Sequence, residues 1–173
     1  MFYSKNKNII ENGLKLSVDL SNDNLICAYK SKLKSPLINF SKIKSHNRSL
    51  YWEAVKPKNN SLIIEKDNFY ILKSKEKIVI PPGLAGEMIP YDTGIGDFRV
   101  HYAGFFDPGF GYPNGAFAVL EVKTNEVSFI LEDGQTIARI KYEKLNKNPS
   151  VIYGSNINSN YQNQKLALSK HFI

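Results

Sequence analysis

Two carboxylates stand in sequence settings that suggest chemistry. Asp107 follows two aromatic residues and directly precedes Pro108-Gly109. This order predicts a strand that ends in a tight turn, with the carboxylate held at the strand end. Such a carboxylate can accept a hydrogen bond from a sugar hydroxyl or orient a water molecule. A plain turn in which Asp is only the turn former explains the same residues, so both interpretations stay open.

Glu121 is the second candidate, because it interrupts a run of residues (118–122) that is otherwise apolar. A carboxylate enclosed in such a strand is costly unless it is paired or has a task. An enclosed carboxyl group within reach of a substrate can act as a general acid or base. The alternative is a glutamate that faces solvent from a half-exposed strand.

Several catalytic classes are excluded by what the sequence lacks. Cys27 is the only cysteine, which rules out a disulfide framework and the cysteine pair of the zinc nucleobase deaminases. The three histidines, His46, His101 and His171, have no metal-ligand spacing, so we expect no protein-held metal. Phosphate-binding glycine loops and the nucleophile elbow of the hydrolases are absent too. A reduced, cytoplasmic protein is the expectation.

The charge of the chain is large and uneven. The 173 residues carry a net charge of +7, with 15 basic and 7 acidic groups in residues 1–80 and 8 basic and 9 acidic groups in residues 81–173. Lysine supplies nearly all of the positive charge, whereas nucleic-acid readers rely on arginine. We therefore expect a solvated lysine-rich surface and no nucleic-acid partner. Apolar runs are too short to span a bilayer, which takes roughly 20 residues, so no membrane association is expected.

Short β-branched and aromatic runs separated by Gly- and Pro-rich turns predict an all-β fold of the sandwich or barrel kind. One short helix is expected over 82–88. The sequence divides into an irregular N-terminal extension (1–60) and a β domain (61–173), whose polar tail begins at about 155. The expected strands comprise residues 14–18, 25–29, 62–64, 69–72, 77–80, 98–102, 117–122, 127–131 and 137–142.

The tail carries Tyr153-Gly154 and then the amide-rich stretch 159–164. Hydroxyl and amide groups that fold back over a pocket could hold a phosphate or the edge of a base. A disordered polar tail is the alternative, and it is the commoner case for such a composition.

Taken in order, these pieces resemble one family. The strings 101–110, 119–122, 131–135, 153–154 and 161–164 are similar to motifs of the metal-free dCTP deaminases. The resemblance covers about residues 62–173 and implies their dUTPase-like fold, a β-clip or distorted β-barrel. The likeness is greatest to the second half of the long bacterial form, in which two such domains are fused in tandem. Residues 13–56 resemble the inter-domain region of that form more loosely.

The resemblance implies that the chain takes part in converting dCTP to dUTP and ammonia in pyrimidine deoxynucleotide synthesis. Glu121 matches the catalytic glutamate, which takes a proton from the attacking water and passes protons to N3 and to the departing ammonia. Asp107 matches the carboxylate that binds the deoxyribose 3′-hydroxyl. Val119 and Leu120 match the backbone positions that face the base.

Three tail residues match positions that contact the triphosphate in this family. Tyr153 and Gln164 keep the family's residue types, whereas Asn160 replaces a family lysine. One phosphate contact is therefore weakened or supplied by another group. No cofactor is expected on protein side chains, and Mg²⁺ would be carried by the nucleotide.

One departure from the family matters more. The family has a run with Ser-Ser and Arg upstream of the Asp-Pro-Gly turn, and residues 88–96 contain neither. A site with two carboxylates and no Arg could not hold a triphosphate. We therefore hypothesise that the chain is half of a composite site, silent alone and active beside a partner that bears the Ser/Arg run. The expected assembly is a homotrimer or a complex with such a half.

Two other functions stay open at the sequence level. Asp107 could orient water on a phosphate, as in the related dUTPases, which would make the chain a nucleotide diphosphatase. The chain could also be a non-catalytic fragment or assembly subunit. The products separate the three functions: a deaminase releases ammonia, a diphosphatase releases pyrophosphate, and a non-catalytic subunit releases neither.

Overall fold

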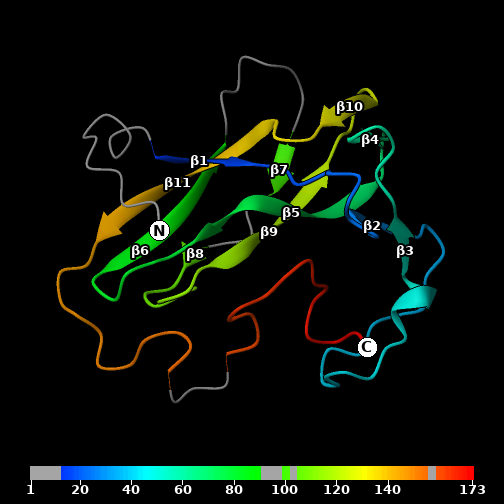
Figure 1. Ribbon diagram of the computed structural model, residues 1–173. Helices are drawn as coiled ribbons and strands as arrows, with labels where there is room; N and C mark the ends of the chain where they lie inside the picture. The colour runs from blue at the N-terminus through cyan, green and yellow to red at the C-terminus, as the bar shows by residue number, and fades with distance from the viewer. Residues whose placement is uncertain (1–12, 91–98, 102–104, 156–158) are drawn as a thin grey trace.

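The described parts of the chain, residues 13–90, 99–101, 105–155 and 159–173 of a computed structural model, are mainly antiparallel β-strands joined by loops (Figure 1). This confirms the expected all-β class. The strands are β1 (Leu14–Ser17), β2 (Ala28–Ser31), β3 (Trp52–Val55), β4 (Ser61–Ile64), β5 (Phe69–Ile78), β6 (Leu84–Pro90), β7 (Arg99–His101), β8 (Phe105–Phe106), β9 (Ala116–Lys123), β10 (Phe129–Glu132) and β11 (Thr136–Lys144).

The strands form three sheets. A five-stranded sheet has the order β3-β2-β5-β9-β7, a four-stranded sheet has the order β1-β11-β6-β8, and β10 pairs with β4 in a two-stranded ribbon. Strands β5 and β9 therefore lie inside the largest sheet, where both of their edges are paired. A side chain on β9 is fixed by ladders on two sides, which is the rigidity that a catalytic group needs.

A core of aliphatic side chains joins the sheets. Strand β9 shows how it is built, because burial alternates along the strand with the period of two that a pleated strand imposes. Its even-numbered residues are buried and its odd-numbered residues face the other way. The fully buried core residues include Leu16, Val18, Leu20, Ile64, Leu72, Ile78, Ile80, Leu120, Leu131 and Ile140.

The run 69–72 and the first two residues of the run 77–80, expected to be separate strands, belong to one strand, β5, which ends at Ile78. The polar residues between them form a bulge, since the register passes from Lys73 opposite Val119 to Lys77 opposite Phe117. The hydroxyl of Ser74 satisfies the bulge, because it accepts from the Ala118 amide at 2.9 Å and donates to the Glu76 carbonyl at 2.7 Å. The polar residues predicted an end to the strand. The pairing with β9 and the hydrogen bonds of Ser74 keep the strand continuous instead.

The helix expected over 82–88 is wrong, because these residues enter strand β6. The backbone of β6 pairs with β11 along seven positions, from Leu84 opposite Lys144 to Pro90 opposite Ala138. Gly86 faces the core at a point where a Cβ would lie 2.7 Å from the Ile80 side chain. Glycine is also a poor helix former. The described helical structure is a single 3₁₀ turn, η1 (Arg48–Leu50).

The described part of the N-terminal region packs with the rest of the chain. Strand β1, expected over 14–18, pairs with β11, and β2 pairs with β5. The expected strand over 25–29 begins later, at Ala28, and β3 was not foreseen. In the described residues, no helix has the length and apolar character needed to cross a membrane.

Candidate functional site

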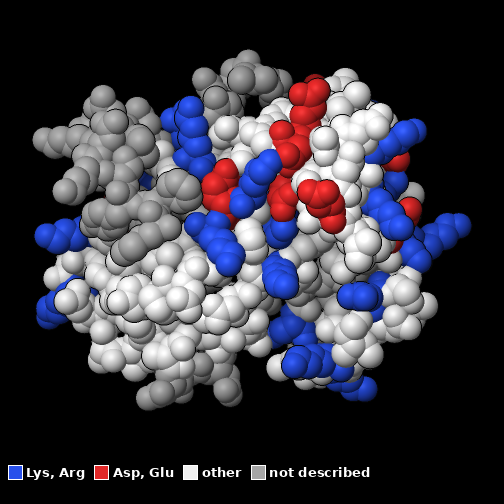
Figure 2. Space-filling model, in the orientation of Figure 1, with Lys and Arg blue, Asp and Glu red and all other residues white. Residues whose placement is uncertain are grey.

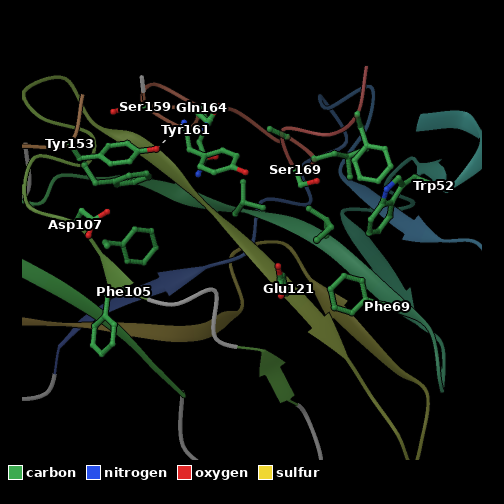
Figure 3. Close-up of a pocket in the computed structure, with 18 residues that line it drawn as sticks. Trp52, Phe69, Phe105, Asp107, Glu121, Tyr153, Ser159, Tyr161, Gln164 and Ser169 are labelled. Carbon is green, nitrogen blue, oxygen red and sulfur yellow. Dashed lines mark hydrogen bonds between the residues drawn. The ribbon is translucent and has the colours of Figure 1, made fainter. Parts of the chain in front are cut away.

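A cleft of about 550 Å³ lies over the outer face of β5 and β9. Its floor includes Phe69 and Ile71 of β5 and Val119 and Glu121 of β9. The turn after β8 forms one wall, and the C-terminal tail covers the cleft from the other side (Figure 3). This volume lies in the range of small-molecule sites.

Glu121 is half-buried in the floor of this cleft. In the ladders it lies opposite Ile71 of β5 and His101 of β7, so its backbone is held on both sides. Figure 3 shows its carboxylate between the Asp107 end and the Trp52 end of the cleft. The sequence left open whether this glutamate faces a pocket or bulk solvent, and the structure places it in the pocket.

Asp107 stands where the sequence predicted, at the end of β8 and the start of a tight turn. The Phe110 amide donates to the Asp107 carbonyl at 3.0 Å, which closes the turn. Gly109, the third residue of the turn, has φ +96°, a left-handed value that a type II turn requires and that favours glycine. The Asp107 side chain is exposed and lines the same cleft as Glu121.

Tyr153 is docked on this turn. Its amide donates to the Pro108 carbonyl at 2.8 Å, and its ring lies 5.7 Å from that of Phe110. The hydroxyl oxygen accepts from the Tyr161 amide at 3.0 Å. Burial raises the pKa of the Tyr153 hydroxyl, and the nearby Asp107 charge acts in the same direction. The hydroxyl therefore keeps its proton to a higher pH than an exposed tyrosine does.

Gln162, which we did not single out from the sequence, fastens the tail to the turn region. Its side-chain oxygen accepts from the Gly111 amide at 3.0 Å, and its nitrogen donates to the carbonyls of Gly109 and Tyr112 at 3.2 and 3.1 Å. A Cβ on Gly154 would lie 2.4 Å from this amide nitrogen. The amide-rich composition of the tail was the signal, but it did not distinguish a positioning glutamine from a binding one.

Gln164 docks the tail on β9. Its side-chain nitrogen donates to the Phe117 carbonyl at 2.9 Å, and its own carbonyl accepts from the Phe117 amide at 3.4 Å. Gln164 and Asn160 both line the cleft. The described part of the tail is therefore folded back over the cleft, which is one of the two alternatives that the sequence left open.

The two ends of the cleft differ in character. The polar side chains of Tyr153, Ser159 and Gln164 lie toward the Asp107 end, whereas the far end is aromatic (Figure 3). There the Trp52 ring lies 6.1 Å from Phe69 and 6.0 Å from Phe172. These aromatic residues were not among the sequence-based candidates, since they come from segments far apart in the sequence.

The described lining carries negative but no positive charge. Asp107 and Glu121 are its two charged residues. Lys73 and Lys77 place their ammonium groups over the Phe117 ring, 4.6 and 5.5 Å from its centroid, outside that lining. Lys73 is also paired with Asp19 at 2.5 Å. A polyanion in this cleft would therefore need further cations.

The side chain of Leu120 is fully buried in the core, so its expected role, which concerns its backbone, stays a prediction. Most of the stretch 88–96, where the Ser/Arg run is absent, lies outside the described residues, as does most of the string 101–104. In the described parts, no three His, Cys, Asp or Glu side chains are grouped so that they could hold a metal ion.

Comparisons with known proteins agree on one family. The model of the 2'-deoxycytidine 5'-triphosphate deaminase (DCD) C-terminal domain matches residues 1–172. The crystal structure of 2'-deoxycytidine 5'-triphosphate deaminase from Agrobacterium tumefaciens matches with a TM-score of 0.72 and 43% identity, over 78% of this chain. The match spans only 42% of that protein's chain. The fold is thus the dUTPase-like fold that the sequence led us to expect. A search of curated proteins gave no match.

Proposed function

Because the chain belongs to the 2'-deoxycytidine 5'-triphosphate deaminase family, matching its C-terminal domain, we propose that it takes part in hydrolysing dCTP to dUTP and ammonia. The observation that carries the proposal is that Glu121, on a strand paired on both sides, shares one cleft with Asp107 and the folded-back tail. A fixed carboxylate beside a binding carboxylate is what water activation on a bound nucleoside requires.

The character of the cleft supports one orientation of the nucleotide. In this orientation the polar end, with Tyr153 and Gln164, receives the triphosphate, and Asp107 binds the deoxyribose 3′-hydroxyl. The base then extends toward Glu121, where the backbone of Val119 and Leu120 offers hydrogen bonds to its edge. Asn160 has no charge and gives the triphosphate only a neutral amide contact.

In this orientation Glu121 acts as both base and acid. Its carboxylate takes a proton from water as the oxygen bonds to C4 of the cytosine ring. It passes that proton to N3, then takes the remaining proton from the new C4 hydroxyl and gives it to the amino nitrogen. The C4 carbonyl forms as the C4–N bond breaks and ammonia leaves. Proton transfer by a positioned side chain contributes about 10²–10⁴-fold in rate.

The shortage of positive charge supports a composite site. A triphosphate is held in proteins mainly by Arg, Lys and backbone amides, and the described lining of the cleft has no cationic side chain. The proposal is that a different polypeptide, which bears the Ser/Arg run, supplies these groups in a complex with this chain. Mg²⁺ would come with the nucleotide and need no protein site of its own.

Product analysis tests this function. The chain is assayed with dCTP and dUTP, alone and after mixing with a polypeptide that bears the Ser/Arg run. We expect ammonia from dCTP in the mixture and almost none from either component alone. Robust turnover by the pure chain would refute the composite site, and pyrophosphate release from either nucleotide would refute deamination in favour of a diphosphatase.

A failed assay is informative when binding is measured beside it. Calorimetry of the same mixture with dCTP shows whether a nucleotide site forms. Binding without turnover would leave a nucleotide-binding subunit, and the absence of both would favour the non-catalytic fragment. Either result contradicts the proposed activity.

A further inference from the structure

Residues 32–50, which we call the basic loop, expose an unusual amount of apolar surface. The loop follows β2 in the sequence and lies beside the C-terminal residues in space. Leu33 is 87% exposed, Leu37 96% and Phe40 76%, and Ile43 and Leu50 are more than half exposed. Exposed apolar residues that gather in one segment mark an interaction surface more often than chance exposure does.

The shape of this loop is fixed, although it buries little of itself. The amides of Lys44 and His46 donate to the carbonyls of Lys170 and His171 at 2.9 and 3.1 Å. The Phe40 ring contacts that of His171, with centroids 5.5 Å apart. Apolar side chains displayed on a fixed backbone lose little conformational entropy when a partner covers them.

The basic loop carries one sign of charge. It contains four lysines and Arg48, and it has no carboxylate side chain. Figure 2 shows blue side chains over the lower right of the molecule, where Figure 1 places this loop. Its partner should therefore combine an apolar centre with acidic surroundings.

The chain itself has a surface of that description. We call residues 61–67 and 126–132, which include β4 and β10, the acidic ribbon. Ile63 and Ile130 are opposite each other in the register and are 58% and 60% exposed, and Val127 is 61% exposed. Leu62, Ile64 and Leu131 of the same two strands are buried in the core.

Carboxylates surround this apolar centre. The acidic ribbon contains four carboxylates and one lysine, Lys66. Glu65 is paired with Lys30 at 2.5 Å. Asp67, Glu126 and Glu132 are exposed, and the described part of the structure gives none of them an ion pair. Their charges are thus available to a partner.

We propose that the basic loop of one copy of this chain docks on the acidic ribbon of a second copy. Each surface supplies the apolar centre and the charge that the other lacks. Figure 1 shows the ribbon (β4 and β10) and the basic loop at the same side of the molecule, and no folded segment of the described chain covers either apolar centre. Because the surfaces are unlike, contacts between copies form a reciprocal pair, a closed ring or an open chain of copies.

A charge-swap experiment tests this pairing without any nucleotide, so its outcome is independent of the proposed function. The loop variant carries Lys34→Glu and Lys42→Glu, and the ribbon variant carries Glu126→Lys and Glu132→Lys. We expect light scattering to show self-association of the native chain and at least tenfold weaker association of each variant alone. An equal mixture of the two variants should recover it, because the acidic loop then meets the basic ribbon.

The matched control is Lys144→Glu with Lys147→Glu, which changes the charge by the same amount at exposed positions outside both surfaces. It should associate like the native chain, and circular dichroism should show all variants folded. A native chain that stays monomeric, variants that associate normally, or a mixture that fails to recover would each overturn the proposal. Binding of a monomeric native chain to anionic phospholipid vesicles would overturn it in favour of a membrane surface.

Discussion

At the scale of single residues, the account depends on how two carboxylates divide the nucleotide between them. Asp107 is exposed on a turn, and Glu121 is half-buried on a central strand. The exposed group suits hydrogen bonding to a sugar, whereas the enclosed group suits proton transfer. Each role predicts a different response to substitution.

Asp107→Asn should weaken the contact with the 3′-hydroxyl while keeping the turn. In the reconstituted enzyme we expect kcat/KM for dCTP to fall about 10- to 100-fold, which corresponds to one hydrogen bond to a charged group. The 2′,3′-dideoxy analogue lacks that hydroxyl, so the variant and the native enzyme should process it equally. An equal loss with both substrates would show that Asp107 does not bind the sugar.

Gln162→Ala tests the residue that fastens the tail. It removes three hydrogen bonds and leaves the Gly111 amide without its acceptor. We expect the free energy of unfolding to fall by about 1–3 kcal/mol and the Gly111 amide to exchange faster. Lys165→Ala, at an exposed tail position, is the control and should change neither quantity. Unaltered exchange at Gly111 in Gln162→Ala would mean that other contacts hold the tail.

At the scale of elements, the positions of the site residues follow from strand pairing and turn chemistry. The strand expected over 117–122 and the Asp-Pro-Gly turn were legible from the sequence, because both depend on neighbours in the chain. The bulge in β5 and the strand β6 were not legible. Each depends on a partner strand distant in sequence, which outweighs the local preference for a break or a helix.

The same distinction applies to the cleft. Glu121, Asp107 and Tyr153 carry their own signals, and the structure brings them to one cleft. Trp52, Phe69 and Phe172 form its aromatic end, yet nothing in their local sequence marks them. The aromatic end of the cleft forms because the Trp52 ring of β3 contacts Phe69 of β5 and Phe172 near the C-terminus. Their role in binding stays outside what the sequence could predict.

Substitution of Gly111 tests the packing of the turn region on β5, because only a residue without a side chain allows this close approach. Gly111 has φ +69°, and a Cβ there would lie 2.3 Å from the Ile78 carbonyl oxygen. Gly134 has a similar φ, +77°, but its nearest neighbour is the Lys75 ammonium nitrogen at 4.0 Å. Gly134→Ala should therefore cost only the conformational term, about 1–2 kcal/mol.

Gly111→Ala should cost clearly more than Gly134→Ala, because backbone atoms must shift as well. Urea unfolding of the two variants measures the difference. Equal losses would show that the turn region can move away from β5 without penalty, and its role in fixing the cleft would then be wrong.

At the scale of the whole molecule, buried ionisable groups predict the dependence of stability on pH. Burial raises the pKa of the Cys27 thiol from 9.0 to about 11. The folded state thus disfavours the thiolate, so this contribution to stability is complete below pH 9 and is lost as the pH rises to 11. Burial also raises the pKa values of Tyr70, Tyr142 and Tyr153, which extends the loss to higher pH.

Cys27→Val removes the thiol while keeping an apolar side chain of similar size. Urea unfolding of the reduced protein, followed by the fluorescence of its single tryptophan, should show a shallower decline between pH 9 and 11 than in the native chain. Parallel declines in the two proteins would mean that the thiol titrates alike in the folded and unfolded states.

The whole molecule also explains why the chain alone should be silent. It spans 42% of the deaminase structure that it matches, and the described lining of its cleft has two carboxylates and no cation. Holding a polyanion beside those carboxylates needs positive charge from outside the described lining. Assembly with a Ser/Arg-bearing half is therefore part of the proposed function.

The most direct test is Glu121→Gln in the chain mixed with a polypeptide that bears the Ser/Arg run. Ammonia release from dCTP and the dissociation constant for dCTP are measured on the same samples. We predict that kcat falls by at least about 10²-fold while the dissociation constant changes little, because the amide keeps the size of the side chain but cannot take the proton. An unchanged kcat would contradict the account.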